Sequence, residues 1–250
     1  MLSKTIVKYI QSLAHKKVRD TEGVFIAEGP KVVDEFLMSQ QFICKNVYAL
    51  NGWITENKNL LKNISAEILV EINETELEKI SLLKTPNNVL AVFYKKEEIL
   101  SDLKNGFSLM LNDIRDPGNM GTIIRTADWF GIKNIICSNE CVDCYNEKVV
   151  QATMGSLARV EIVYTDLENF INQHAEIKVY AAALNGKSIF SINKIEEGII
   201  LIGNESKGIA ENLLRLSTEK ITIPKKGEAE SLNASVACGI ILSHVVQIAR

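Results

Sequence analysis

Hydrophobic and polar positions along the chain predict a succession of short helices and strands. Helical spacing of apolar residues is found in LSKTIVKYIQSLA, EGPKVVDEFLMS and ETELEKISLL. Runs of β-branched and aromatic residues, which are typical of strands, are found in NVYAL and VLAVFY. All five lie within the first hundred residues. This part of the chain is therefore expected to form a small α/β domain.

From residue 107 onwards the pattern becomes a regular alternation of buried strands and helices. The expected strands are FSLMLND, KNIICS, VEIVYT, KVYAAAL and GIILIGN. The expected helices are NMGTIIRTADWFG, NEKVVQATMGSL and SLNASVACGIILSHVVQIA. Such alternation predicts a mostly parallel sheet with helices on both faces. The preceding segment YKKEEILSDLKNG is polar and charged, so we expect domains at 1–97 and 107–250 joined by a linker at 98–106.

Composition narrows the class of protein. The chain has 250 residues, of which 46% are hydrophobic and 24% charged, as expected for a globular protein with a substantial core. No window approaches the roughly 20 apolar residues of a membrane span, and the N-terminus lacks the apolar stretch of a secretory signal. Five cysteines are an odd number, which favours a reducing compartment. We expect a cytoplasmic protein without a membrane partner.

Charge is unevenly distributed. The net charge of -3 argues against non-specific coating of nucleic acid. The first 19 residues nevertheless contain no acid, and their basic residues are Lys4, Lys8, Lys16, Lys17 and Arg19. This segment is either a solvated helix face or an arm that contacts phosphates.

The first candidate site is the junction LNDIRDPGNMGTIIRTADWFG. Its Asp-Pro-Gly-Asn sequence, ending at Asn119, is typical of a turn. Arg125 follows among apolar residues of the expected helix and therefore needs an anionic partner. That partner is either a bound anion or a carboxylate of the chain, such as Asp113 or Glu205.

The second junction is ILIGNESKG at 200–208, where a buried strand enters a polar loop. Its two glycines have the spacing of a phosphate loop, but Ile209 and Ala210 follow where such a loop requires Lys and Ser or Thr. Open α/β sheets bind ligands at the carboxyl ends of their strands. Glu205 is therefore either a functional acid or a helix-capping one.

The third junction is ITIPKKGEAESLNASVACGI at 221–240. Ser231 is expected to cap the long C-terminal helix, with Asn233 in its first turn. Free amide groups at such a position favour an electron-rich group. Capping by Ser231 leaves the neighbouring Asn233 without an explanation.

Taken together, the three junctions resemble the motifs of the SpoU (TrmH-like) family of RNA ribose 2′-O-methyltransferases. The matching patterns are Asn119-x5-Arg125, Gly203-Asn204-Glu205-x2-Gly208 and Ile223-Pro224…Ser231-Leu232-Asn233-x-Ser235. KVVQATMGSLARV is similar to the family's connecting helix. The N-terminal part, including TPNNVLAVF, resembles the L30e-like substrate-binding domain of many members. The resemblance covers nearly the whole chain.

The resemblance implies an α/β domain with a deep trefoil knot, which general topology rules would exclude. It implies a homodimer that binds S-adenosylmethionine through Gly203, Ile223, Ser231 and Leu232. The expected reaction is 2′-O-methylation of a ribose in structured RNA.

Roles for individual side chains follow from this reaction. The resemblance implies a role for Arg125 either as a general base or as a phosphate clamp that polarises the hydroxyl; the second suits it better, because a guanidinium is a reluctant base. Asn119, Glu205 and Asn233 would orient the ribose and Arg125. Lys16, Lys17 and Arg19 would contact RNA phosphates.

Several alternatives stay open. The extra N-terminal domain favours 23S ribosomal RNA as substrate, with transfer RNA as the alternative. A catalytically silent RNA-binding knot protein is a third possibility, although all the motif residues are present. A dehydrogenase is excluded because no strand is followed by Gly-x-Gly-x-x-Gly.

The spacing of Cys137, Cys141 and Cys144 matches an iron–sulfur loop. Cys137 ends an expected strand, which favours a chance set of thiols over a cluster or zinc, and we expect no metal.

Overall fold

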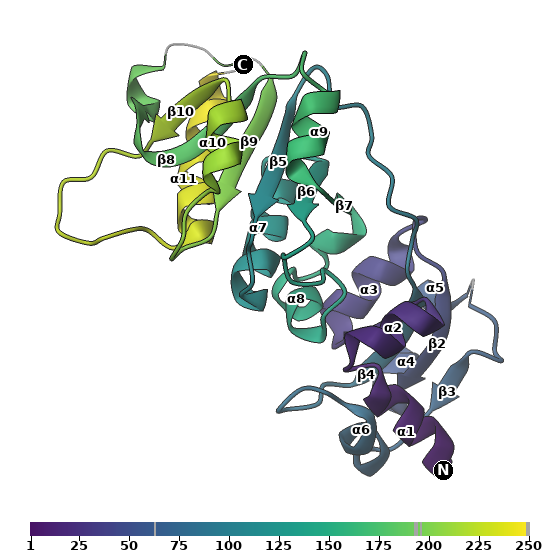
Figure 1. The fold of residues 1–250 in the computed structure, drawn as a ribbon. Helices are drawn as coiled ribbons and strands as arrows, with labels where there is room; N and C mark the ends of the chain where they lie inside the picture. Colours follow the sequence, from purple (N-terminus) through teal and green to yellow (C-terminus); the bar gives the residue numbers. More distant parts are fainter. Residues whose placement is uncertain (63, 193–194, 196, 249–250) are drawn as a thin grey trace. The chain divides into compact units, whose positions relative to one another are not determined.

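The computed structural model describes residues 1–62, 64–192, 195 and 197–248. The chain divides into two compact units, one comprising residues 1–97 with 143–158 and the other residues 98–142 with 159–250 (Figure 1). Each unit has its own sheet.

The first unit is built on a four-stranded sheet in the order β1-β4-β2-β3. The strands are β1 (Val24–Glu28), β2 (Cys44–Ala49), β3 (Leu69–Glu71) and β4 (Val89–Tyr94). β4 pairs antiparallel with both neighbours, whereas β2 and β3 are parallel. The helices are α1 (Lys4–Ser12), α2 (Lys16–Glu22), α3 (Pro30–Met38), α4 (Asn51–Glu56), α5 (Lys58–Leu61), α6 (Glu74–Ile80), α8 (Glu147–Ala152) and the 3-10 helix η1 (Ser156–Ala158).

Local sequence explains most of these elements. α3 has Pro30 in its first turn, and the Asn73 side chain accepts the amide of Glu76 in a capping box at the start of α6. β1 is buried along its whole length, so it shows no alternation of polar and apolar residues. The hydrophobic pattern did not predict β1, because the apolar run is only four residues long before Glu28.

Residues 143–158 are grouped with the N-terminal unit although they lie between β6 and β7 in sequence. The Tyr145 ring lies 4.7 Å from the Phe25 ring of β1, centroid to centroid, and α8 contacts β1. The single helix expected over NEKVVQATMGSL instead ends at Ala152, because Met154 and Gly155 have φ angles of 51° and 93°. The expected sequence domain 107–250 therefore contributes one segment to the other compact unit.

The second unit contains a six-stranded sheet in the order β10-β8-β9-β5-β6-β7. All of its strand pairs are parallel, which confirms the predicted parallel sheet. The strands are β5 (Phe107–Asn112), β6 (Asn134–Ser138), β7 (Glu161–Thr165), β8 (Val179–Ser188), β9 (Gly198–Gly203) and β10 (Glu219–Thr222).

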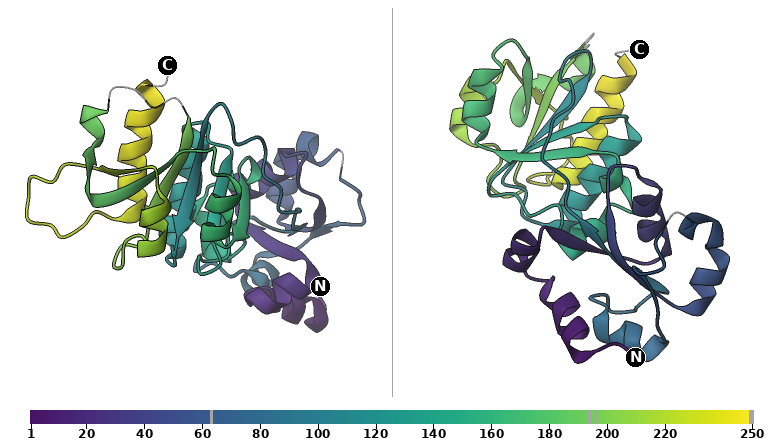
Figure 2. Two further views of the ribbon diagram at one scale, coloured as in Figure 1. Left: turned by 45° about the horizontal axis from the view of Figure 1, so that its top comes forward. Right: turned by 90° about the vertical axis from the view of Figure 1, so that its right-hand side faces the viewer.

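Helices cover both faces of this sheet, as predicted (Figures 1 and 2). One face packs against α9 (Leu167–Gln173) and α10 (Glu211–Leu216), with Met110 and Leu201 of the sheet in the shared core. The other face is covered by α7 (Pro117–Trp129) and α11 (Ala234–Ile248), which contact each other. The 3-10 helix η2 (Ile189–Ser191) contacts α11.

Among the described residues, none of the helices combines the length and apolar character needed to cross a lipid bilayer.

Candidate active site

Two of the three sequence junctions meet at the carboxyl ends of β5 and β9. Asn112 at the end of β5 lies opposite Gly203 at the end of β9 in the parallel register. The loops that follow are joined by a hydrogen bond of 2.8 Å from Asn204 Nδ2 to the carbonyl oxygen of Asp113. The candidate site thus lies at the edge of the sheet where open α/β folds bind ligands.

The loop after β9 is a closed turn. Asn204 Oδ1 accepts the amides of Ser206 and Lys207 at 2.9 and 3.1 Å. The backbone of Asn204 also exchanges two hydrogen bonds with that of Gly208, whose φ is 70°. Glu205 lies in this turn and not at the start of α10, where Ala210 is the cap residue. The alternative of Glu205 as a helix-capping acid is therefore wrong.

Gly203 allows a close approach within the chain itself. A Cβ atom added there would lie 2.4 Å from the carbonyl carbon of Gly208 and 2.5 Å from the amide nitrogen of Ile209. Both neighbours are backbone atoms, so they cannot move aside as a flexible side chain could. The glycine was expected to accommodate a cofactor, and the structure shows that the 204–208 turn already requires it.

We expect Gly203→Ala to lower stability by about 1–3 kcal/mol, because the added methyl group overpacks the turn. Gly106→Ala is the matched control, since a Cβ at Gly106 would meet no atom within 4 Å. Denaturant titrations of both variants and the unaltered protein measure the difference. Equal stability of Gly203→Ala and Gly106→Ala would contradict this account of the turn.

Asn119 joins this turn to α7 and α11. It lies in the first turn of α7, where its backbone amide is capped by Asp116 Oδ1 at 2.8 Å. Its Nδ2 donates to Glu205 Oε1, and its Oδ1 accepts from Asn233 Nδ2 at 2.8 Å. Three of the four expected catalytic residues are therefore joined by side-chain hydrogen bonds.

Asn233, rather than Ser231, caps α11. Asn233 Oδ1 accepts the amides of Ser235 and Val236 at 2.9 and 3.3 Å and the Ser235 hydroxyl at 2.6 Å. The capping role expected for Ser231 is wrong because the helix begins at Ala234, three residues later. Ser231 Oγ instead contacts the carbonyl oxygen of Glu205 at 3.5 Å, which brings the third junction to the same site.

The hydrogen bonds of this network have a common direction. Asn233 donates to Asn119, and Asn119 donates to Glu205, so the two amides are oriented by the carboxylate at the end of the chain. Ser235, to which the sequence analysis gave no role, fixes the opposite end of Asn233. Its spacing two residues after Asn233 is the signal that could have identified it. A carboxylate held in this way can accept a hydrogen bond from a substrate hydroxyl.

Arg125 lies apart from this network. Its side chain is exposed on α7. Arg125 follows Asn119 by six residues, and residues at that separation lie on different faces of a helix. Asp113 contacts Arg115 and Lys207, and Glu205 contacts Asn119. Within the described part of the chain, neither carboxylate pairs with Arg125, so the alternative of an ion pair with Asp113 or Glu205 is not found.

The apolar residues expected at the cofactor site lie on the loop between β10 and α11. Ile223 is half-buried, and 46% of the Leu232 surface is exposed. Open apolar side chains of this kind can pack against a flat heterocycle. Of the other two residues expected to bind the cofactor, Gly203 ends β9 and Ser231 precedes Leu232 on the same loop.

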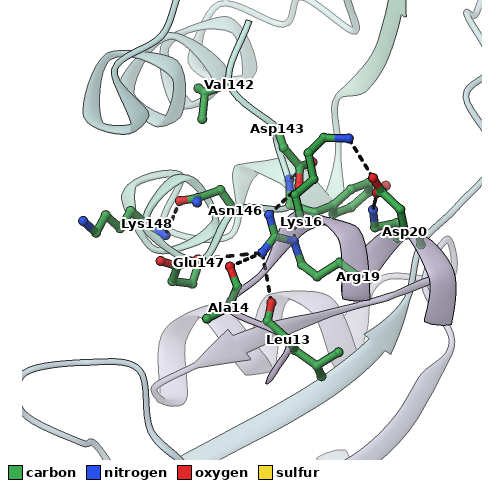
Figure 3. A network of polar contacts seen from close by, with 12 residues as sticks. Leu13, Ala14, Lys16, Arg19, Asp20, Val142, Asp143, Asn146, Glu147 and Lys148 are labelled. Carbon is green, nitrogen blue, oxygen red and sulfur yellow. Dashed lines mark hydrogen bonds and ion pairs between the residues drawn. The ribbon is translucent and has the colours of Figure 1, made fainter. Parts of the chain in front are cut away.

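The basic residues near the N-terminus differ in their exposure to solvent. Lys16 is exposed and pairs with Asp20 at 2.8 Å, and Lys17 is exposed. Arg19 is only 2% exposed: Asp143 Oδ2 lies 2.7 Å from its Nη2, and its Nη1 donates to the carbonyl oxygens of Leu13 and Ala14 (Figure 3). The expected contact of Arg19 with RNA phosphates is therefore wrong, because its guanidinium is buried in an ion pair.

The three closely spaced cysteines are buried. Cys141 Sγ accepts the amide of Ile114 at 3.3 Å, and hydrogen bonding with Cys137 lowers the pKa of the Cys141 thiol. No group of three or more metal-ligating side chains is found in the part of the chain that the structure describes.

Comparison with known proteins supports the interpretation of the motifs. Residues 106–243 match the SpoU rRNA methylase family, and residues 4–91 match the MRM3-like substrate binding domain. The chain is 29% identical over 243 residues to the 23S rRNA (guanosine(2553)-2′-O)-methyltransferase RlmP of Bacillus subtilis, covering 96% of this chain and 95% of that protein.

Solved structures agree over the full length. A TrmH-family protein from Porphyromonas gingivalis has a TM-score of 0.87 and 32% identity, covering 98% of both chains. An AdoMet-bound rRNA methyltransferase from Sinorhizobium meliloti has a TM-score of 0.84 and 32% identity, covering 98% of this chain and 95% of that one. With motif residues, sheet topology and family match in agreement, this chain belongs to the SpoU rRNA methylase family.

Proposed function

We propose that this protein is an enzyme that transfers the methyl group of S-adenosylmethionine to a ribose 2′-hydroxyl of structured RNA, with 23S ribosomal RNA as the substrate. The observation that carries the proposal is the hydrogen-bonded set Asn119, Glu205 and Asn233 at the meeting point of the three family motifs. Two of the relatives named above, RlmP and the Sinorhizobium meliloti protein, are named as rRNA methyltransferases, and the second has AdoMet bound.

Each residue has a role in this reaction. The sulfonium of S-adenosylmethionine supplies an electrophilic methyl group, so the protein mainly has to position the hydroxyl. Gly203, Ile223, Ser231 and Leu232 would hold the cofactor. Glu205, kept in orientation by the two amides, accepts a hydrogen bond from the ribose. Arg125 grips the adjacent phosphate and polarises the hydroxyl.

A second copy of this chain completes the site in our proposal. Arg125 and Trp129 are four residues apart on α7 and therefore share a face. Trp129 is 84% exposed, and Val236 on the contacting helix α11 is 49% exposed. A homodimer that buries this apolar surface would carry Arg125 into the interface, next to the motif loops of its partner.

The substrate assignment rests on the N-terminal part. The relative RlmP, which matches over nearly the whole chain, is named for 23S rRNA. A solved structure concerned with methylation of C/U34 on tRNA matches only 58% of this chain. We therefore assign RNA binding to the domain at 1–97, with Lys16 and Lys17 as phosphate contacts, and methyl transfer to the domain at 107–250, with 98–106 as the linker. A cytoplasmic location follows from this substrate.

A trefoil knot is part of the proposal. Its support is the contact between the 204–208 turn and Ser231 on the loop before α11, together with the family assignment.

Calorimetric titration with S-adenosylmethionine tests the cofactor assignment. We expect saturable binding at one site per chain, and weaker binding by Leu232→Ala, whose apolar side chain would contact the cofactor. Circular dichroism on the same samples confirms that they are folded. Absence of heat from folded protein would overturn the proposed function.

A further inference from the structure

Two exposed cations lie on either side of Asp113, beside the candidate active site. Arg115 Nε donates to Asp113 Oδ1 at 2.5 Å, and Lys207 Nζ lies 3.8 Å from Asp113 Oδ2. The exposed fractions of the two basic side chains are 62% and 72%, whereas that of Asp113 is 14%. The carboxylate of Asp113 is thus largely buried, whereas the two basic side chains are exposed to solvent.

Asp113 is held firmly from several directions. Its amide donates to Ser138 Oγ at 3.1 Å, and its carbonyl oxygen accepts from Asn204 Nδ2 at 2.8 Å. Its φ of 60° is in the left-handed region, which few residues other than glycine adopt. Residues held in such conformations cluster at functional sites. The bond to Asp113 also raises the pKa of Arg115, so the guanidinium keeps its charge.

The two cations are carried by the same loops as the candidate catalytic residues. Arg115 precedes Asn119 by four residues, and Lys207 follows Glu205 by two. Because the Asn119–Glu205 hydrogen bond and the Asp113 contacts join the same pair of loops, the two sets of residues are neighbours. The cations therefore lie beside the place where the ribose would be held.

The charges and geometry suit a phosphodiester. Two cations share one carboxylate, which leaves a net positive charge at the surface. Nε of Arg115 is directed at Asp113, and a guanidinium anchored in this way can present its remaining donors as a fork to phosphate oxygens. Ion pairs at such exposed positions contribute little to stability in water, so folding alone gives a weak reason for the arrangement.

We propose that Arg115 and Lys207, aligned by Asp113, bind a phosphate of the RNA strand that flanks the methylated ribose. This inference rests on the proposed function, since it assigns part of the substrate to the same site. It adds two side chains that bind one phosphate, and one positioning residue, to those named above. The contacts are independent of base sequence, so they fix the position of the strand without selecting it.

The salt dependence of RNA binding tests the proposal. The double variant Arg115→Gln with Lys207→Gln is expected to reduce the slope of log K against log salt by about 0.7–0.9, the value for one phosphate contact, and each single variant by part of that. We expect the KM for RNA to rise several-fold and kcat at saturating RNA to stay within about twofold. Lys133→Gln is the matched control, because this exposed lysine precedes β6 and so lies at the opposite edge of the parallel sheet.

Two conservative variants separate charge from alignment. Arg115→Lys keeps the charge but loses the fork, so the salt slope is expected to stay and the RNA affinity to fall. Asp113→Asn keeps both cations but loosens their alignment, so the slope is expected to stay while the KM for RNA rises. S-adenosylmethionine affinity is expected to be unchanged in both.

The outcomes are distinguishable. If the unaltered protein methylates RNA while Arg115→Gln and Lys207→Gln behave like Lys133→Gln, the phosphate contact is wrong and the proposed function stands. If sedimentation shows that the variants alter dimer dissociation while RNA binding is unchanged, Arg115 and Lys207 lie in a contact between protein chains and the proposal is overturned. If the unaltered protein transfers no methyl group to any RNA, the proposed function itself fails.

Discussion

Arg125→Lys is expected to lower kcat/KM for methyl transfer by about 10²–10³, the usual cost of losing one pre-oriented donor at a reacting centre. Lysine keeps the charge, but it cannot form the two parallel hydrogen bonds of a guanidinium to a phosphate. Arg125 is exposed, and in the part of the chain that the structure describes it pairs with neither Asp113 nor Glu205, so its replacement is expected to leave the fold of the single chain intact. Methyl transfer at varied RNA concentration, together with thermal unfolding, measures both effects.

The matched control for this prediction is Arg215→Lys. Arg215 is also exposed and helical, but it lies on α10, which covers the other face of the sheet. We expect its turnover to equal that of the unaltered protein. Near-full turnover of Arg125→Lys would show that bidentate binding of a phosphate is not the role of this residue.

Asp143→Ala is expected to destabilise the protein by about 3–5 kcal/mol, because it removes the closer of two carboxylates from the buried Arg19 guanidinium and leaves Glu147 Oε2 at 4.0 Å from Nη1. Asp143 is 8% exposed and Arg19 2% exposed, so water cannot replace the lost partner. The double variant Arg19→Met with Asp143→Leu is expected to recover most of the loss, since apolar pairs of similar volume replace buried ion pairs well. Denaturant midpoints measured by circular dichroism provide the comparison.

Asp20→Ala is the control for this second prediction. Asp20 pairs with Lys16 at 2.8 Å and with Lys95 at 2.6 Å, but it is 45% exposed, so the expected loss is at most about 1 kcal/mol. If Asp143→Ala were no more harmful than Asp20→Ala, the buried pair would not be what fixes residues 143–158 to the N-terminal unit.

The sequence predicts the sheet of the second unit well because parallel strands are buried on both faces. Continuous apolar runs such as FSLMLND and GIILIGN are therefore unambiguous when helices of matching length separate them. The same reasoning did not find β1, because its apolar run ends after four residues at the buried Glu28. A knot cannot be inferred from periodicity at all.

The sequence predicted which residues belong to the candidate site better than it predicted their contacts. Motif spacing identified Asn119, Glu205 and Asn233, and the structure joins them by hydrogen bonds. Motif spacing could not show that Asn233 rather than Ser231 caps α11. Both residue types cap helices, and the sequence gives the start of a helix only to within a few residues. Arg19 was misassigned because its partner Asp143 is 124 residues away in sequence.

The most direct test is to incubate the purified protein with ribosomal RNA and S-adenosylmethionine carrying a labelled methyl group, and then to map alkali-resistant linkages. The account predicts that label enters ribosomal RNA at a single ribose 2′-oxygen, and that Asn119→Asp, which sets a second carboxylate against Glu205, loses most of this transfer. Transfer RNA serves as the competing substrate in a parallel reaction. Label found only on a base, only in transfer RNA, or in no RNA while the protein is folded and binds the cofactor, would contradict it.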